Sequence, residues 1–175
     1  YHASTGNTGI LYLNATNAFT TAATAWNNTS PTSTVFSLGA GSGSSTNTSA
    51  HSYVAYLFAA VAGYSAFGSY TGNGSTDGPF VYLGFRPRWI MIKNYTAASA
   101  GSWRIYDTSR VTYNADGAVL WADLSSAEVT DPSYQLDHVA NGFKIRNTSS
   151  DYNASGNTYI YAAFAENPFK LSLAR

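Results

Sequence analysis

The sequence predicts an all-β fold, with antiparallel and jelly-roll-like β-sandwich modules in tandem and little helix. Short runs of apolar and aromatic residues recur along the 175 residues, and clusters of Gly, Asn, Asp and Ser separate them. Such runs predict strands and such clusters predict turns, because β-branched and aromatic residues favour strands while Gly and Asn tolerate turn conformations. A near-repeat of the sequence, described below, predicts the tandem arrangement.

Eight short runs are expected to form strands. The run 53–58 is apolar at both odd and even positions, which predicts a strand covered on both faces. A later run alternates, which places Phe143 and Ile145 toward the core and Lys144 and Arg146 toward solvent. The eight expected strands are residues 9–14, 35–38, 53–58, 80–83, 89–93, 103–107, 143–146 and 159–164.

Turn signals separate these runs. The pair Asn141-Gly142 directly precedes an expected strand and is the clearest hairpin signal in the chain. Pro87 is expected to interrupt the ladder between two runs, because proline has no N–H to donate. Helix signals are few. Residues 123–128 predict one helical turn, with Ser125 as the capping residue and Glu128 three positions later.

The chain nearly repeats itself. Residues 47–59 align with residues 153–165 at a constant offset of 106 positions, and both segments run from a polar loop into an aromatic strand and then a break. Residues 35–38 align with 142–145 at an offset of 107, and 9–13 align with 117–121 at 108. Small drifts of this kind are what insertions in surface loops produce.

The repeat predicts one and a half units. Residues 63–175 are expected to form a complete second unit, and residues 1–62 the C-terminal half of a first unit. On this interpretation Tyr1 falls inside a strand, and the front strands of the first unit are expected upstream or in another chain.

Composition excludes several classes of function. Charged residues make up 10% of the chain, and Lys plus Arg balance Asp plus Glu at nine each. A net charge of zero gives no electrostatic basis for binding nucleic acid. No apolar run reaches the roughly 18 residues of a membrane span, so no membrane insertion is expected. There is no cysteine, and the remaining richness in Tyr, Ser, Thr and Asn is typical of β-structured proteins on extracellular or virion surfaces.

Five motifs span much of the second part of the chain: residues 64–80, 84–93, 102–107, 141–147 and 159–169. Together they resemble a β-rich domain of uncharacterised function in the structural proteins of tailed-bacteriophage virions, and the resemblance covers about residues 63–170. It implies a virion structural protein, a tail fibre or similar surface appendage. The expected location is the virion surface, and the expected assembly is a homotrimer with other virion proteins as partners. The resemblance implies no catalytic residues.

Catalytic constellations are weak in this sequence. A triad needs a nucleophile, a base and an orienting carboxylate, and only His2, His51 and His138 offer an imidazole. We interpret His51 as a surface loop residue, because it replaces an asparagine of the repeat. Asp137 and His138 are adjacent, so on a strand they point to opposite faces.

Glycoside cleavage needs two carboxylates roughly 5 to 10 Å apart. Most of the acids lie in turns, where Asp bonds its own backbone. Asp107 stands out because it shares a strand face with Trp103, while Arg104 and Tyr106 lie on the other face. A salt bridge to an arginine is the simpler expectation for Asp107. A polysaccharide-depolymerising tailspike domain therefore remains an alternative, as does a purely architectural head or decoration fibre module.

A host-surface glycan is the expected ligand, bound without catalysis. Aromatic rings stack on the apolar faces of sugars, and hydroxyl and amide groups satisfy sugar hydroxyls. The simpler interpretation is that these aromatic residues cap the sandwich or bury against a neighbouring subunit. We expect no cofactor, although Asp151 and Asn153 could offer oxygens to calcium. The candidate glycan-binding residues, all in polar loops, are Trp26, Tyr95, Tyr113, Tyr134 and Tyr152.

Overall fold

The computed structural model describes residues 1–40, 46–96 and 101–168. Eleven strands and two short 3₁₀ helices make up its regular structure, and every strand pairing is antiparallel. The elements are η1 (Ala3–Thr5), β1 (Gly9–Ile10), β2 (Thr20–Thr21), β3 (Ser65–Thr71), β4 (Phe80–Tyr82), β5 (Pro87–Asn94), β6 (Arg104–Asp107), β7 (Ala118–Trp121), β8 (Val129–Thr130), η2 (Pro132–Tyr134), β9 (Leu136–Val139), β10 (Gly142–Ile145) and β11 (Thr158–Ala165). The predicted all-β, antiparallel class is confirmed.

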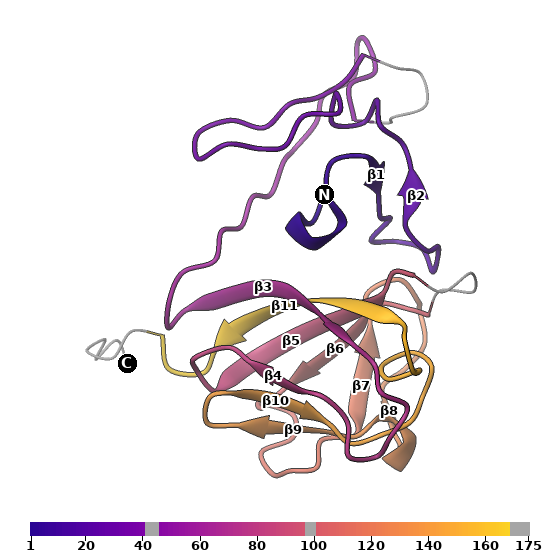
Figure 1. Ribbon diagram of the computed structural model, residues 1–175. Helices are drawn as coiled ribbons and strands as arrows, with labels where there is room; N and C mark the ends of the chain where they lie inside the picture. The colour runs from indigo at the N-terminus through magenta and orange to yellow at the C-terminus, as the bar shows by residue number, and fades with distance from the viewer. Residues whose placement is uncertain (41–45, 97–100, 169–175) are drawn as a thin grey trace.

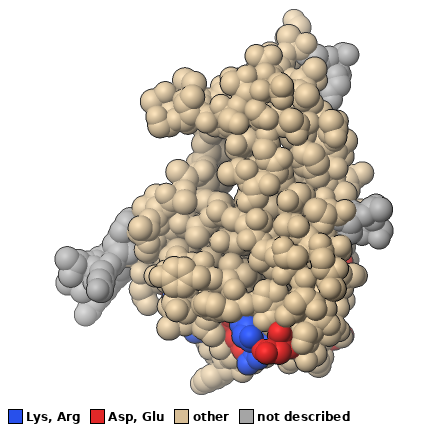
Figure 2. Space-filling model, viewed as in Figure 1, with Lys and Arg blue, Asp and Glu red and all other residues tan. Residues whose placement is uncertain are grey.

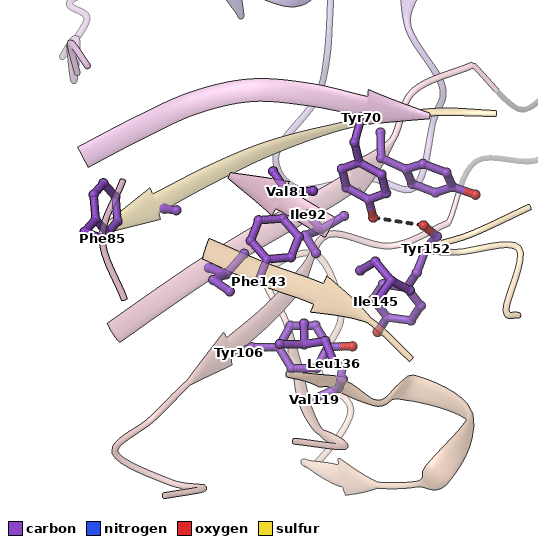
Figure 3. Close-up of a cluster of buried hydrophobic side chains, with 13 residues drawn as sticks. Tyr70, Val81, Phe85, Ile92, Tyr106, Val119, Leu136, Phe143, Ile145 and Tyr152 are labelled. Atoms are coloured by element: carbon purple, nitrogen blue, oxygen red, sulfur yellow. Dashed lines mark hydrogen bonds between the residues drawn. The ribbon is translucent and has the colours of Figure 1, made fainter. Parts of the chain in front are cut away.

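Two sheets face each other across one hydrophobic core (Figure 1). The larger sheet has six strands in the order β3-β11-β5-β6-β7-β8, and the smaller has three in the order β4-β10-β9. Figure 3 shows side chains of both sheets meeting between them. The buried core residues are Tyr70, Val81, Phe85, Ile90, Ile92, Tyr106, Val119, Leu136, Phe143, Ile145, Tyr152, Tyr159 and Ala163.

Strand β11 lies between β3 and β5 in the larger sheet. It pairs with β3 on one side and with β5 on the other. Its inward residues Tyr159 and Ala163 are fully buried in the core. Its outward Phe164 packs against Phe67 of β3 and Trp89 of β5, with ring centroids 5.8 and 5.7 Å apart. This strand is apolar on both faces because both of its faces are covered.

The β9–β10 hairpin forms where the Asn-Gly signal predicts it. Val139 pairs with Gly142 across the turn. A Cβ at Gly142 would lie 2.0 Å from the Val81 carbonyl oxygen, so only glycine lets β4 pair this closely with β10. Phe143 and Ile145 are both fully buried, which confirms the inward face read from the alternation.

Three expected strands of the N-terminal part differ in the structure. The run 9–14 is reduced to the two residues of β1, and the runs 35–38 and 53–58 form no strand. The Val35 carbonyl instead accepts a hydrogen bond from the Thr32 N–H in a local turn. The expectation of a covered strand at 53–58 was wrong. These residues are exposed, and β11 already occupies the position between β3 and β5.

One local expectation in the second part was also wrong. Residues 123–128 form no helical turn, and the Asp123 carboxylate instead accepts a hydrogen bond from the Trp103 N–H at 3.1 Å. The break expected between the runs 80–83 and 89–93 is present, because β4 and β5 are separate strands in different sheets. Pro87 itself is the first residue of β5, where the register with β11 shifts. A proline at a strand end withholds no ladder hydrogen bond from the strand's interior.

The N-terminal residues lie over the outer face of the larger sheet (Figure 1). The Trp103 Nε1–H donates to the Tyr12 carbonyl at 2.8 Å, and the Lys93 Nζ donates to the Thr16 carbonyl at 2.9 Å. Burial lowers the pKa of Lys93, although Asp123 and Asp151 oppose that shift. Within residues 1–40, 46–96 and 101–168, no helix is long and apolar enough to cross a membrane.

Candidate binding groove

A groove of about 430 Å³ lies where three loops of the second part meet. One loop follows β3, one contains η2, and one follows β10. The lining is made of hydroxyl, amide and guanidinium groups with a single proline: Thr76, Pro132, Ser133, Arg146, Asn147, Thr148 and Ser149. Loops carried by a rigid sandwich are a common place for binding sites.

The η2 side of the groove is held by a helix cap. The Asp131 carboxylate accepts a hydrogen bond from the Ser133 N–H at 2.7 Å, and Pro132 occupies the start of the helix. Proline suits this position because its fixed φ matches the helix and its missing N–H would have no partner there. The hydrogen bonds from Ser133 lower the pKa of Asp131.

A buried asparagine joins the other two loops. Asn153 is fully buried, and its Oδ1 accepts a hydrogen bond from the Asn73 N–H at 2.8 Å. Its Nδ2 lies 2.6 Å from the Ser75 carbonyl and 2.9 Å from the Asn147 carbonyl. A buried amide with partners on each loop fixes their separation, because losing any partner would leave a polar group unsatisfied.

The charges at the groove are balanced. The Arg146 Nε donates to the Asp137 carboxylate at 2.6 Å, and its Nη1 lies 3.9 Å from Asp77. Lys144 also pairs with Asp77, at 2.7 Å. Hydrogen bonding and charge from Lys144 lower the pKa of the exposed Asp77. The Arg146 side chain remains 43% exposed, so its guanidinium can still meet a ligand.

Charge is scarce on one face of the molecule. Figure 2 shows a small cluster of acidic and basic side chains on this face, which otherwise carries little charge. A neutral surface rich in hydroxyl and amide groups suits an uncharged polyol better than an ionic ligand.

Two of the predicted glycan-binding residues pack together inside the protein. Tyr152 is fully buried, so its ring has no surface to offer a sugar, and the expected ligand role is wrong for this residue. Burial raises the pKa of its phenol. Tyr134 belongs to η2 and is partly buried, with its ring 6.0 Å from that of Tyr152. Tyr134 is not among the residues that line the groove.

The other three candidates lie apart from the groove. Trp26 donates its Nε1–H to the Gly9 carbonyl at 2.9 Å and packs edge-on against Tyr1. Tyr95 packs against Phe19, with ring centroids 6.4 Å apart. Tyr113 is 84% exposed. The structure brings none of these three together, and Tyr113 alone presents most of its ring.

A buried arginine stabilises the groove's surroundings and was not expected from the sequence. Arg104 lies on the inner face of β6 and pairs with Asp151. Its guanidinium carbon lies 5.2 Å from the Trp121 and Tyr134 ring centroids and 5.6 Å from that of Tyr152. The alternation of the strand places Arg104 on the same face as Tyr106, which is the core face. This shared face was the feature of the sequence that could have predicted a buried arginine.

The acids are engaged in structural contacts. All nine Asp and Glu residues lie within the described ranges. Asp123 and Asp131 accept backbone hydrogen bonds. The other seven each have a basic side chain within 4 Å: Asp77, Asp107, Asp116, Glu128, Asp137, Asp151 and Glu166. No group of three His, Asp or Glu residues that could hold a metal ion occurs in this part of the chain.

The salt bridge expected for Asp107 is present. Arg110 donates from its Nε to Asp107 at 2.6 Å, and its Nη1 pairs with Glu128. Burial opposes ionisation of Asp107, but the hydrogen bonds and charge of Arg110 outweigh it and lower its pKa. A carboxyl with a lowered pKa is a poor general acid near neutral pH.

One buried acid–imidazole pair resembles part of a catalytic triad. The His138 Nε2 lies 3.1 Å from Asp116 Oδ2, and the two side chains are 1% and 0% exposed. The Asp116 Oδ1 also accepts the Ala118 N–H at 2.9 Å. Among the described residues, no hydroxyl group lies within hydrogen-bonding distance of His138 Nδ1. Both groups are enclosed, so the geometry supports a structural role.

Comparison with known proteins points to a family. A family model described as Domain of unknown function (DUF7483) matches residues 1–168. Neither a curated protein nor a solved structure matches the chain. The family match extends from the N-terminal residues through both facing sheets.

Proposed function

The chain belongs to the DUF7483 family. We propose that it is a structural and adhesive module, one that binds a neutral glycan without cleaving it. The observation that carries this proposal is the groove: its hydroxyl and amide lining is held in place by the buried Asn153 on one side and by an exposed capping hydrogen bond on the other. The Asn153 hub and the Asp131 cap position two sides of the groove before any ligand arrives. Pre-positioned polar groups reduce the entropy that binding costs.

The chemistry of the groove matches a polyol. Ser133, Thr148 and Thr76 offer hydroxyls that both donate and accept hydrogen bonds, as sugar hydroxyls do. Arg146 adds directional donors, while Asp77 and Asp137 cancel its charge. A neutral groove favours sugar hydroxyls over phosphate, and Pro132 adds a small apolar surface for the face of a ring.

The setting that we propose is the surface of a bacteriophage virion. This rests on the resemblance of residues 63–170 to tailed-phage structural proteins, together with a neutral, cysteine-free and hydroxyl-rich composition. In that setting the module would form part of a tail fibre or similar appendage, assembled as a homotrimer. Immunogold labelling of intact particles and light scattering of the purified chain test the location and the assembly.

A glycan array with two matched variants tests the binding proposal. Thr148 lines the groove and is exposed, so Thr148→Phe fills the groove without touching the core. Thr112 is also exposed but lies outside the groove, so Thr112→Phe is the control. We expect Thr148→Phe to weaken binding about tenfold or more, which is a loss of ~1.4 kcal/mol. The control should bind like the unmodified chain.

Two outcomes would contradict the proposal. Equal binding by both variants would remove the groove from the function. Release of reducing sugar from a bacterial polysaccharide, abolished by Asp107→Asn, would instead favour a depolymerising enzyme.

A further inference from the structure

One apolar segment of the chain lies exposed and unpaired. In residues 53–61, Val54 is 80% exposed, Tyr56 83%, Leu57 69% and Phe58 67%. Within the described ranges, no backbone hydrogen bond joins residues 54–58 to another segment. Figure 1 shows this segment rising from the start of β3 as an extended chain. An extended, apolar and unpaired segment is a template for strand pairing.

The repeat identifies what this segment is built to pair with. Residues 53–59 align with residues 159–165 of β11. In the structure, β11 lies between β3 and β5 and pairs with both. A sequence with the pattern of β11 is therefore expected to need one strand on each side.

The N-terminal hairpin supports the same alignment. Strands β1 and β2 pair through Ile10 and Thr20. The repeat aligns these two strands, to within two positions, with β7 and β8 of the second part. Strands β7 and β8 pair through Val119 and Val129. The N-terminal part thus reproduces one hairpin of the second unit and contains the counterpart of its last strand. Within residues 1–40 and 46–62, no strand aligns with β3, β4 or β5.

A second copy of this chain fits the segment poorly. In the place of β11, Ala55 would replace Tyr161, whose ring fills the space above Gly68. Leu57 would replace Ala163, which is fully buried, and would overfill the core there. The intended neighbour therefore has the same strands but different side-chain sizes at these two positions.

We propose that residues 53–59 are a donor strand that completes the larger sheet of a neighbouring unit of this same fold. The strand lies antiparallel between that unit's equivalents of β3 and β5. Tyr53, Ala55 and Leu57 face its core, and Val54 and Tyr56 face outward, as their counterparts on β11 do. This proposal stands independently of glycan binding in the groove.

The exit of the donor strand is already anchored. Val61 and Ser65 exchange two backbone hydrogen bonds, at 3.1 and 2.9 Å, around a turn. Phe58 packs on Phe67 and Phe164 of the larger sheet, with ring centroids 6.2 and 5.8 Å apart. The neighbouring unit would therefore be held close to the β3 edge, and only the strand itself has to become ordered.

The test supplies the donor strand with a neighbouring unit made of the chain's own residues. A second copy of residues 63–105 is placed directly before Tyr1, which supplies equivalents of β3, β4 and β5. Ala55→Tyr and Leu57→Ala are added so that the donor strand matches β11 in size. Hydrogen exchange, read by mass spectrometry, follows the amides of residues 54–58. We expect exchange to slow about a hundredfold or more relative to the unmodified chain.

Two substitutions serve as matched controls in the extended chain. Tyr56→Pro removes a ladder N–H and should abolish the protection, whereas Tyr56→Ala should keep most of it. In the unmodified chain both should leave stability unchanged, because Tyr56 is exposed and unpaired there. A difference between Tyr56→Pro and Tyr56→Ala in the extended chain would show that the protection depends on strand pairing and not on the aromatic ring.

Three results would overturn the proposal. The first is unchanged fast exchange of residues 54–58 in the size-matched extended chain, whether or not the added residues fold. The second is full protection of these amides in the unmodified monomer. The third is protection of the unmodified chain that rises with protein concentration, which would make a second copy the partner. Whether the unmodified or the extended chain binds a glycan does not change the hydrogen exchange expected for residues 54–58.

Discussion

Gly68 on β3 faces the ring of Tyr161 on β11. A Cβ at Gly68 would lie 2.6 Å from the Tyr161 hydroxyl oxygen and 2.9 Å from the adjoining ring carbon. The two residues are paired in the strand register, so the ring lies directly over the glycine backbone. Glycine within a strand often marks such a close approach, and here it makes room for a core tyrosine.

We expect Gly68→Ala to destabilise the fold by about 1 to 3 kcal/mol, because the added methyl must displace a rigid ring. Urea unfolding measures the change. Ser69→Ala is the control, because Ser69 is exposed on the same strand and should shift stability by less than ~0.5 kcal/mol. Equal stability of Gly68→Ala and the unmodified chain would contradict the close packing.

We expect substitutions at Arg104 and Asp151 to have strongly coupled effects on the free energy of unfolding, because the two side chains form an ion pair. Arg104→Met leaves Asp151 without its cation and removes a guanidinium packed among three rings. We expect a loss of about 3 to 5 kcal/mol, because an unpaired charge near the core is costly. The double variant with Asp151→Asn should recover part of this loss. A double-mutant cycle in urea measures the coupling, and additive losses would argue against it.

Asp107 predicts a pH dependence of stability. Its pKa in the folded protein is below the ordinary value of 3.8. Its contribution is therefore present above pH 3.8 and is lost as the pH falls through the lower, folded-state pKa. We expect Asp107→Asn to cost about 1 to 2 kcal/mol at pH 7 and almost nothing once Asp107 is protonated.

Urea unfolding at a series of pH values checks this expectation. Asp77→Asn is the control, because Asp77 is 81% exposed and its ion pair is screened by solvent. Its cost should stay small and change little with pH. A constant cost of Asp107→Asn down to acid pH would mean that the Arg110 pair contributes nothing.

The buried tyrosines predict instability in alkali. Burial raises the pKa of Tyr70 and of Tyr106 well above the ordinary value of 10.0. A raised folded-state pKa means that the stability is fully present below pH 10 and is lost as the pH rises further. Ultraviolet titration should show the exposed phenols ionising first, followed by a cooperative step in which the buried phenols ionise on unfolding. Smooth titration of every phenol without unfolding would contradict this.

The hydrogen bond drawn in Figure 3 provides a variant for the same measurement. The Tyr70 hydroxyl donates to the Tyr152 carbonyl at 2.9 Å in the core. Tyr70→Phe should remove one ionising phenol and cost about 1 to 3 kcal/mol at neutral pH, because the carbonyl loses its partner. The variant should then unfold in alkali at a higher pH than its lower stability at neutral pH alone would predict.

Much of the core face of the second part could be predicted from sequence alone. Alternation placed Phe143 and Ile145 inward, and both are fully buried. The Asn141-Gly142 signal predicted the hairpin that the structure contains. These features are local, because the two-residue period and the turn preferences depend only on neighbouring residues.

The groove could not be predicted in the same way. Its lining comes from three loops that are far apart in the sequence, and a buried amide, Asn153, brings two of them together. The predicted aromatic residues looked available because they lie in polar loops. Tyr152 is nevertheless buried against Tyr106 and Arg104, which are distant in the sequence.

The antiparallel β class, the inward faces of the clearest strands and the near-repeat can all be read from the amino-acid order, because each follows from local spacing or direct comparison. Which runs become strands depends on contacts between distant segments. Residues 53–58 and β11 have matching patterns, yet only β11 has a strand on each side. A β-strand is stabilised by its neighbours, so its formation depends on long-range pairing that a local pattern cannot supply.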